Sequence, residues 1–278
     1  MADAEPKTGI LRFSPGLMGL LTVIGYHHAL MIFIALSILL LSLLLAGCSS
    51  SSPQIPSIFL MSLYYEKYAP VLDGAQTDPG VSTTIANIVG GAQLEVRVGY
   101  FGICIQPNGG GFICNQNASI LASIVKVDED PLNLIWVAST FKDAVVFPYL
   151  IIVALIFAFF CFLLLATYPG WNSVMQEDDD GSLMEAKPFP SRAVSQVALA
   201  CIFISSVFIL VSVLWQHTAS VAASAVAQDL GNGSVKSGVG ASAMILGWFG
   251  FGFLVIVMIG LLAIILTLKF FQQLTGGD

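Results

Sequence analysis

The chain has 278 residues, of which 56% are hydrophobic and only 10% charged, and its formal net charge at pH 7 is −7. A water-soluble domain needs more surface charge than this, and nucleic-acid binding needs clustered lysine and arginine. The composition, with a mean hydropathy of +0.88, excludes both classes and predicts a protein of the lipid bilayer.

Four stretches are long enough to cross a bilayer, since about 20 apolar residues in a helix span its hydrocarbon core. They are residues 29–47, 144–167, 193–214 and 243–268, and none of them contains Asp, Glu, Lys or Arg. The predicted fold is therefore an α-helical membrane protein built as a four-helix bundle. The remaining segments are a cytosolic or interfacial N-terminus (1–28), a large extracellular loop domain (48–143), a cytosolic loop (168–192), an extracellular loop (215–242) and a cytosolic tail (269–278).

Cys48 follows the first predicted span in the sequence Leu-Leu-Ala-Gly-Cys, which imitates a bacterial lipobox. A signal peptide places its apolar region close to a short basic N-terminal segment. Here the apolar run begins only near residue 29, so lipoprotein processing is excluded. Three interpretations of Cys48 stay open: a small buried residue, a palmitoylation site or a third thiol on the outer side.

The centre of the large loop has the sequence pattern of a disulfide-bonded β-hairpin. Leu94, Val96, Val98 and Tyr100 alternate with polar residues or glycine, which predicts a strand with one covered face. A turn-rich segment, residues 107–111, separates this strand from a short apolar run that ends at Cys114. Pairing across such a turn would bring Cys104 opposite Cys114, and we predict a disulfide between them.

Two sequons indicate which side of the membrane this loop faces. Asn117-Ala-Ser and Asn232-Gly-Ser match the N-glycosylation acceptor pattern and fall on the same side of the predicted bundle as the hairpin. Glycosylation and disulfides are both features of the non-cytosolic side. With an even number of spans, both termini are then predicted to be cytosolic.

The sequence offers little for catalysis. Phosphate-loop, zinc-protease and nucleophile-elbow spacings are absent, so we expect no enzyme and no cofactor. For a metal ion the weak candidates are Asp128, Glu129 and Asp130, although a solvated acidic surface is the favoured interpretation.

A resemblance to a known family rests on the residues Gly99-Tyr100-Phe101-Gly102-Ile-Cys104, followed by Cys114. They resemble the glycine, two hydrophobics, glycine, any residue, cysteine motif of a fungal family, the pheromone-induced calcium regulator and membrane fusion family (factor-induced gene one type). Four spans with a large, disulfide-bearing first outer loop are also similar to the claudin superfamily. The resemblance implies a small antiparallel extracellular β-sheet over the bundle, with the glycines and the disulfide in an architectural role.

The resemblance further implies a multi-pass plasma-membrane regulator of calcium influx and of membrane and cell fusion during fungal mating. Its implied partners, besides the lipid bilayer, are a calcium channel, membrane proteins of the facing cell or further copies of the chain. Two alternatives stay open, because claudin-type folds serve several functions. One is a structural scaffold of membrane domains or cell contacts, and the other is an oligomeric cation pore with the acidic residues 128–130 at its mouth.

Overall fold

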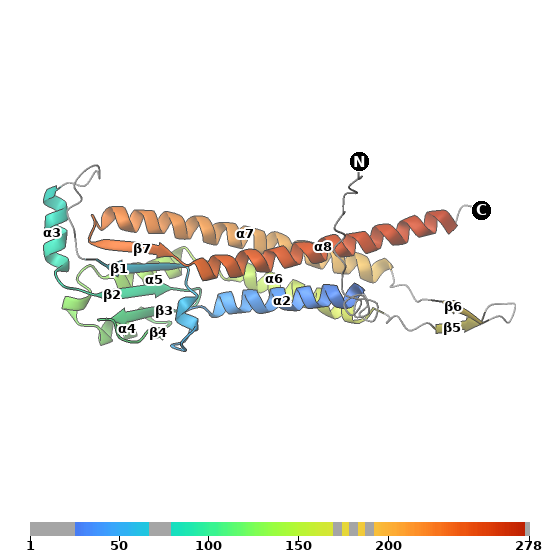
Figure 1. The fold of residues 1–278 in the computed structure, drawn as a ribbon, viewed down its shortest axis with the longest axis horizontal. Helices are drawn as coiled ribbons and strands as arrows, with labels where there is room; N and C mark the ends of the chain where they lie inside the picture. The colour runs from blue at the N-terminus through green and yellow to red at the C-terminus, as the bar shows by residue number, and fades with distance from the viewer. Residues whose placement is uncertain (1–25, 67–78, 169–173, 178–182, 187–191, 276–278) are drawn as a thin grey trace, which may run out of the picture.

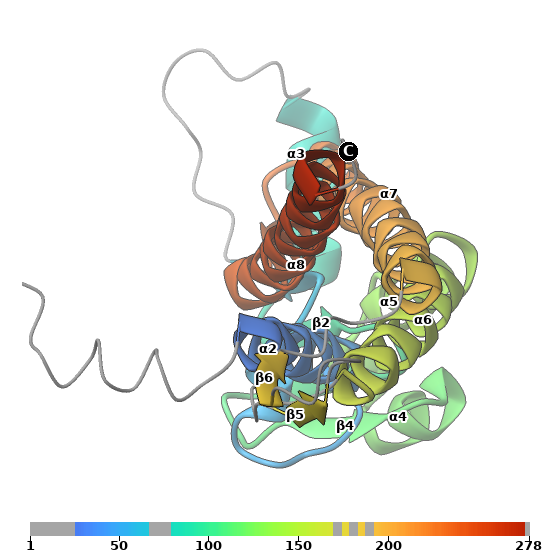
Figure 2. The same ribbon diagram turned by 90° about the vertical axis from the view of Figure 1, so that its right-hand side faces the viewer.

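Four long helices form the core of the molecule in the computed structural model, which describes residues 26–66, 79–168, 174–177, 183–186 and 192–275. They are α2 (Tyr26–Ala46), α6 (Tyr149–Ala166), α7 (Arg192–Leu230) and α8 (Ala241–Thr275). All four are long and apolar enough to cross a membrane, which confirms the predicted four-span bundle. Seen along the bundle in Figure 2, they form a ring in the order α2, α6, α7, α8.

Small side chains and buried hydroxyls hold the helices together. Ala154 and Ala158 of α6 are completely buried or nearly so. The Ser205 hydroxyl of α7 donates to the Ala154 carbonyl at 2.8 Å, and the Ser37 hydroxyl of α2 donates to the Gly250 carbonyl of α8 at 2.8 Å. Within lipid, helices associate through such close packing and interhelical hydrogen bonds rather than through hydrophobic burial.

A five-stranded antiparallel sheet lies at one end of the bundle (Figure 1). Its strand order is β4-β3-β2-β1-β7, which confirms the expected small antiparallel sheet. The strands are β1 (Met61–Tyr65), β2 (Leu94–Val98), β3 (Ile103–Pro107), β4 (Ile113–Asn115) and β7 (Val235–Val239). One face is apolar, with Leu63, Val96 and Ile105 fully buried, and it packs on α5 (Leu134–Ala144) and on α7.

Shorter helices complete the sheet end. They are η1 (Ile55–Ser57), α3 (Pro79–Val89), α4 (Ala118–Ile124) and η2 (Val127–Glu129). At the opposite end of the molecule (Figure 1), between the second and third spans, β5 (Val174–Glu177) pairs with β6 (Leu183–Ala186) in a separate hairpin.

Three features differ from the sequence-based expectation. The alternating strand ends at Val98, and an extra strand, β3, stands between it and the run that contains Cys114. Helix α7 continues to Leu230 and is 39 residues long, well beyond the predicted end of the third span at residue 214. The segment 215–242, expected as a plain loop, contains that helical extension and the strand β7. The predicted N-terminal segment, residues 1–28, lies mostly outside the described residues.

Candidate functional site

The four motif residues Gly99 to Gly102 form the tight turn that joins β2 to β3. The Gly99 amide donates to the Gly102 carbonyl at 2.9 Å. Tyr100 at the tip is 5% exposed, whereas Phe101 is 37% exposed. The motif is therefore a turn with one aromatic residue directed into the molecule and the other at its surface.

Both motif glycines lie directly against the backbone that leaves the first span. A Cβ atom added to Gly99 would stand 2.1 Å from the Gly47 carbonyl oxygen, and one added to Gly102 would stand 2.0 Å from the Cys48 carbonyl oxygen. Real Cβ contacts are never this short, so only glycine allows the turn to rest here. The same holds at the start of α8, where a Cβ on Gly240 would stand 1.6 Å from the Phe59 carbonyl oxygen. Glycine thus sets the distance between the sheet and the bundle.

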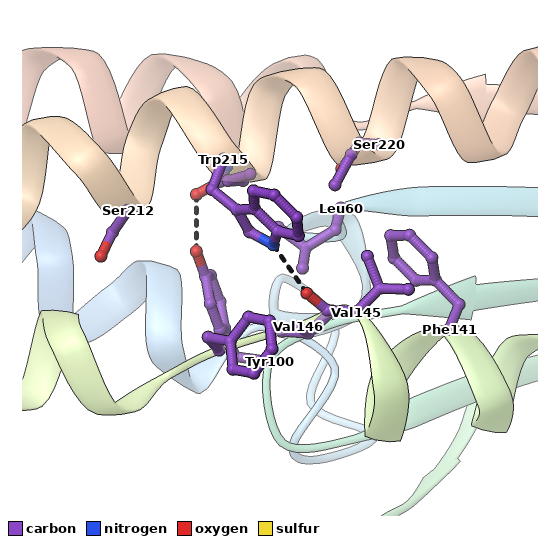
Figure 3. A pocket seen from close by; sticks show the side chains of 11 residues that line it. Leu60, Tyr100, Phe141, Val145, Val146, Ser212, Trp215 and Ser220 are labelled. Carbon is purple, nitrogen blue, oxygen red and sulfur yellow. Dashed lines mark hydrogen bonds between the residues drawn. The ribbon is translucent and has the colours of Figure 1, made fainter.

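Tyr100 links this turn to the third span (Figure 3). Its hydroxyl donates to Oε1 of Gln216 on α7 at 2.9 Å, and Nε2 of Gln216 contacts Sδ of Met244 on α8 at 3.6 Å. Gln216 is 4% exposed. Burial raises the pKa of Tyr100, so the phenol stays protonated and remains the donor. A turn of the five-stranded sheet is in this way hydrogen-bonded to α7, one of the four long apolar helices.

A small cavity of about 10 Å³ adjoins this hydrogen bond. Its lining includes the side chains of Ser212 and Ser220, both nearly fully buried. Trp215 closes it on one side by donating from Nε1 to the Val145 carbonyl at 2.8 Å (Figure 3).

Tyr100→Phe is expected to lower the stability of the protein by about 1–3 kcal/mol, because the buried Oε1 of Gln216 then has no donor. Thermal unfolding of the detergent-solubilised protein measures the change. Tyr149→Phe is the matched control, since Tyr149 is 73% exposed, and it should leave the unfolding temperature unchanged. Equal unfolding temperatures for Tyr100→Phe and the natural protein would contradict a structural role of this hydrogen bond.

The structure joins Cys104 of β3 to Cys114 of β4 by a disulfide. The two residues are direct partners in the antiparallel ladder, with their Cα atoms 4.0 Å apart. The bond therefore closes the hairpin that follows the motif turn.

Arg97, the neighbour of Cys104 on β2, is held on the same face of the sheet. Its guanidinium lies over the rings of Phe59 and Phe112, 4.8 and 4.1 Å from their centroids, an arrangement that attracts a cation to an aromatic face. It also pairs with Glu95 at 2.7 Å and donates to the Pro56 carbonyl at 3.1 Å. These contacts tie the segment after the first span to the sheet.

Cys48 is fully buried beneath the motif turn. Its Sγ lies 3.6 Å from the Ile58 carbonyl oxygen, and burial raises the pKa of the Cys48 thiol to about 12, although the charge of Arg97 acts in the opposite direction. A buried, protonated thiol is a poor nucleophile. Of the three interpretations, the structure favours the small buried residue.

The acidic candidates do not form a metal site in the part of the chain that the structure describes, where no group of three or more ligating side chains comes together. The Asp130 carboxylate accepts hydrogen bonds from the Tyr65 hydroxyl at 2.7 Å and from the Leu134 and Ile135 amides at 2.7 and 3.1 Å. Glu129 accepts from Asn108 at 2.7 Å, and Asp128 is exposed. Asp130 thus has a structural role, because its carboxylate accepts hydrogen bonds from the first two amides of α5.

Both sequons lie in the sheet end of the molecule. Asn117 is exposed and caps α4, where its Oδ1 accepts from the Ser119 amide at 2.9 Å. Asn232 lies in the turn between α7 and β7 with a φ of 44°, and Ser234 of the same sequon is fully buried. The two sites therefore differ in access, although they share one end of the fold.

Two partners of the motif escaped the sequence analysis. Gln216 lies just after residue 214, the predicted end of the third span. Gly47 is the last residue of the first predicted span. A glutamine beside an apolar run and a glycine before a serine-rich exit are common features, so neither carries a signal that points to the motif.

Comparison with models of known protein families identifies a relationship. The model of a family described as "Ca2+ regulator and membrane fusion protein Fig1" matches residues 81–267, a range that includes the motif turn, the disulfide hairpin and three of the four spans. A search of curated proteins finds no match.

Proposed function

The chain belongs to the Fig1 family of Ca2+ regulators and membrane fusion proteins, and from this premise we propose that it regulates calcium influx and membrane fusion at the plasma membrane of mating fungal cells. The sheet end faces outward and both termini are cytosolic. The outer sheet acts on a calcium channel in the same membrane or on the facing membrane.

The observation that carries this proposal is the junction between the motif turn and the bundle. Backbone contacts at Gly99 and Gly102 and the hydrogen bond from Tyr100 to Gln216 fix the sheet to the ends of two spans. A partner that shifts the outer sheet would also disturb these contacts at the ends of the spans, which provides a physical connection between the sheet and the helices. Such a connection suits a regulator that senses a partner outside the membrane.

The regulator is favoured over an oligomeric pore by the placement of charge. The predicted spans 29–47, 144–167, 193–214 and 243–268 contain no Asp, Glu, Lys or Arg, whereas ion pathways through membranes usually keep such groups in the bundle interior. The pore hypothesis also places the acidic residues 128–130 at the mouth of the pore. The Asp130 carboxylate is instead hydrogen-bonded to amides at the start of α5.

Calcium flux assays distinguish a regulator of calcium entry from a pore formed by this protein alone. Purified protein reconstituted alone into phosphatidylcholine liposomes should give the same calcium entry as empty liposomes, while its expression in mating cells should raise calcium uptake. The Asp128→Asn, Glu129→Gln double variant is the matched control, and it should behave like the natural protein in both assays. Calcium entry into the liposomes that this variant abolishes would establish the pore instead.

A scaffold role has its own signature. Cells that lack the protein would then keep normal calcium uptake and show disordered membrane patches. Normal calcium uptake in those cells would contradict the proposed regulation of calcium influx.

A further inference from the structure

One row of side chains crosses the outer sheet on the face opposite Leu63, Val96 and Ile105. Lys236 of β7 is the register partner of Tyr64 on β1, Tyr64 is the partner of Glu95 on β2, and Glu95 is the partner of Gln106 on β3. Directly paired residues in a ladder point to the same side of a sheet. The row therefore lies opposite the apolar face that packs on α5 and α7.

A cleft of about 300 Å³ lies at the end of the sheet that carries this row and is lined in part by Tyr65 and Leu94. Tyr64, Glu95 and Gln106 line it, together with Gln93 before β2 and Gly109 in the loop after β3. This volume is at the small end of ligand sites and holds roughly one or two sugar rings.

The cationic side chains beside the cleft are each paired with a carboxylate. Glu95 is paired with Arg97 at 2.7 Å, and Lys236 is paired with Glu66. Each cation is thus matched by a carboxylate, and two further carboxylates lie nearby: Asp130 accepts from Tyr65 and Glu129 accepts from Asn108. Among these residues no cation is left unpaired to attract an anionic polymer, so the surroundings disfavour one. A neutral ligand that forms hydrogen bonds suits these surroundings.

The lining combines an aromatic ring with planar hydrogen-bonding groups. Tyr64 is half-buried, so part of its ring is open to a ligand. Gln106 donates from Nε2 to the Gly110 carbonyl at 2.6 Å, which orients its amide and leaves the oxygen as an acceptor. Gln93 is exposed and offers both a donor and acceptors. Neutral sugars present an apolar C–H face that stacks on an aromatic ring, and hydroxyls that bond to amides and carboxylates.

We propose that this cleft binds a neutral glycan, with Tyr64 as the stacking platform and with Gln93, Glu95 and Gln106 as the hydrogen-bonding groups. The proposal rests on the outward orientation of the sheet stated above. It adds a partner class to the proposed function, namely the sugars carried by the surface that the protein meets.

Saturation-transfer difference NMR tests the proposal on the full-length protein in phosphatidylcholine nanodiscs, with mannobiose and chitobiose as probes. At least one of these disaccharides should receive saturation, and Tyr64→Ala should weaken its binding about tenfold. Tyr64→Phe keeps the ring and should bind as well as the natural protein. Tyr149→Ala removes an aromatic residue that is 73% exposed outside the cleft, and it should change nothing.

Absence of saturation transfer to both disaccharides would overturn the glycan site. So would equal binding by the natural protein and the Tyr64→Ala variant, or salt-sensitive binding of a sulfated polysaccharide alone. A failed binding assay leaves the regulation of calcium entry standing, because calcium uptake in cells reads that function separately.

Discussion

Gly102→Ala is expected to abolish correct folding of the five-stranded sheet. The added methyl group would stand 2.0 Å from the Cys48 carbonyl oxygen and 2.8 Å from the carbonyl carbon. Both atoms belong to the backbone, which cannot turn aside as a flexible side chain can. Overpacking costs typically 1–3 kcal/mol even among side chains, so we expect a loss of about 3 kcal/mol or more. This is a large share of the stability of an ordinary domain.

The matched control is Gly111→Ala, in the loop that separates β3 from β4. It introduces the same methyl group, but no heavy atom lies within 4 Å of the new Cβ position. Fluorescence-detected gel filtration in detergent should show a folded, monodisperse peak for Gly111→Ala and aggregated or absent protein for Gly102→Ala. If the two variants give the same profile, the backbone contact at the motif turn has no structural importance.

Removal of the disulfide is the second large expected effect. The double variant Cys104→Ala, Cys114→Ala should lower the free energy of unfolding by about 2–3 kcal/mol, because the cross-link closes a loop of ten residues and restricts the unfolded chain. Thermal unfolding measures the loss. In cells, surface display, calcium uptake and mating-pair fusion should fall together, since the hairpin follows directly from the motif turn.

A reducing agent provides the control for this second effect. It should lower the unfolding temperature of the natural protein toward that of the double variant and leave the variant itself unchanged. Non-reducing mass mapping identifies the bond directly, and free thiols at both positions in the untreated protein would show that the predicted linkage is wrong.

Much of the architecture was readable from local patterns. Uncharged apolar runs predicted the four spans, because each run by itself must satisfy the length of the bilayer. The alternation of Leu94, Val96 and Val98 predicted a strand with one covered face, and all three residues are buried. The turn-rich segment after Pro107 predicted the hairpin in which Cys104 and Cys114 are paired. In each case the information lies within a few residues of the feature it determines.

The length of the third helix was not readable in the same way. After residue 214, the predicted end of the third span, α7 continues through an alanine- and serine-rich segment to Leu230. It is helical because its inner face packs on the sheet: the Ser224 hydroxyl lies 2.6 Å from that of Ser237 on β7, and Gln228 donates to the Ser237 carbonyl at 3.1 Å. Tertiary packing more than intrinsic propensity decides where such a helix ends.

The amino-acid sequence by itself determined that this is a membrane protein with four spans and a cystine-closed β-hairpin, since hydropathy and turn chemistry act over short distances along the chain. Only the tertiary structure decided that β7 pairs with β1, 176 residues away at Ser62 and Gly238, and that the motif glycines rest on Gly47 and Cys48. Such contacts depend on where the folded chain brings distant backbones together, and no local pattern encodes that distance.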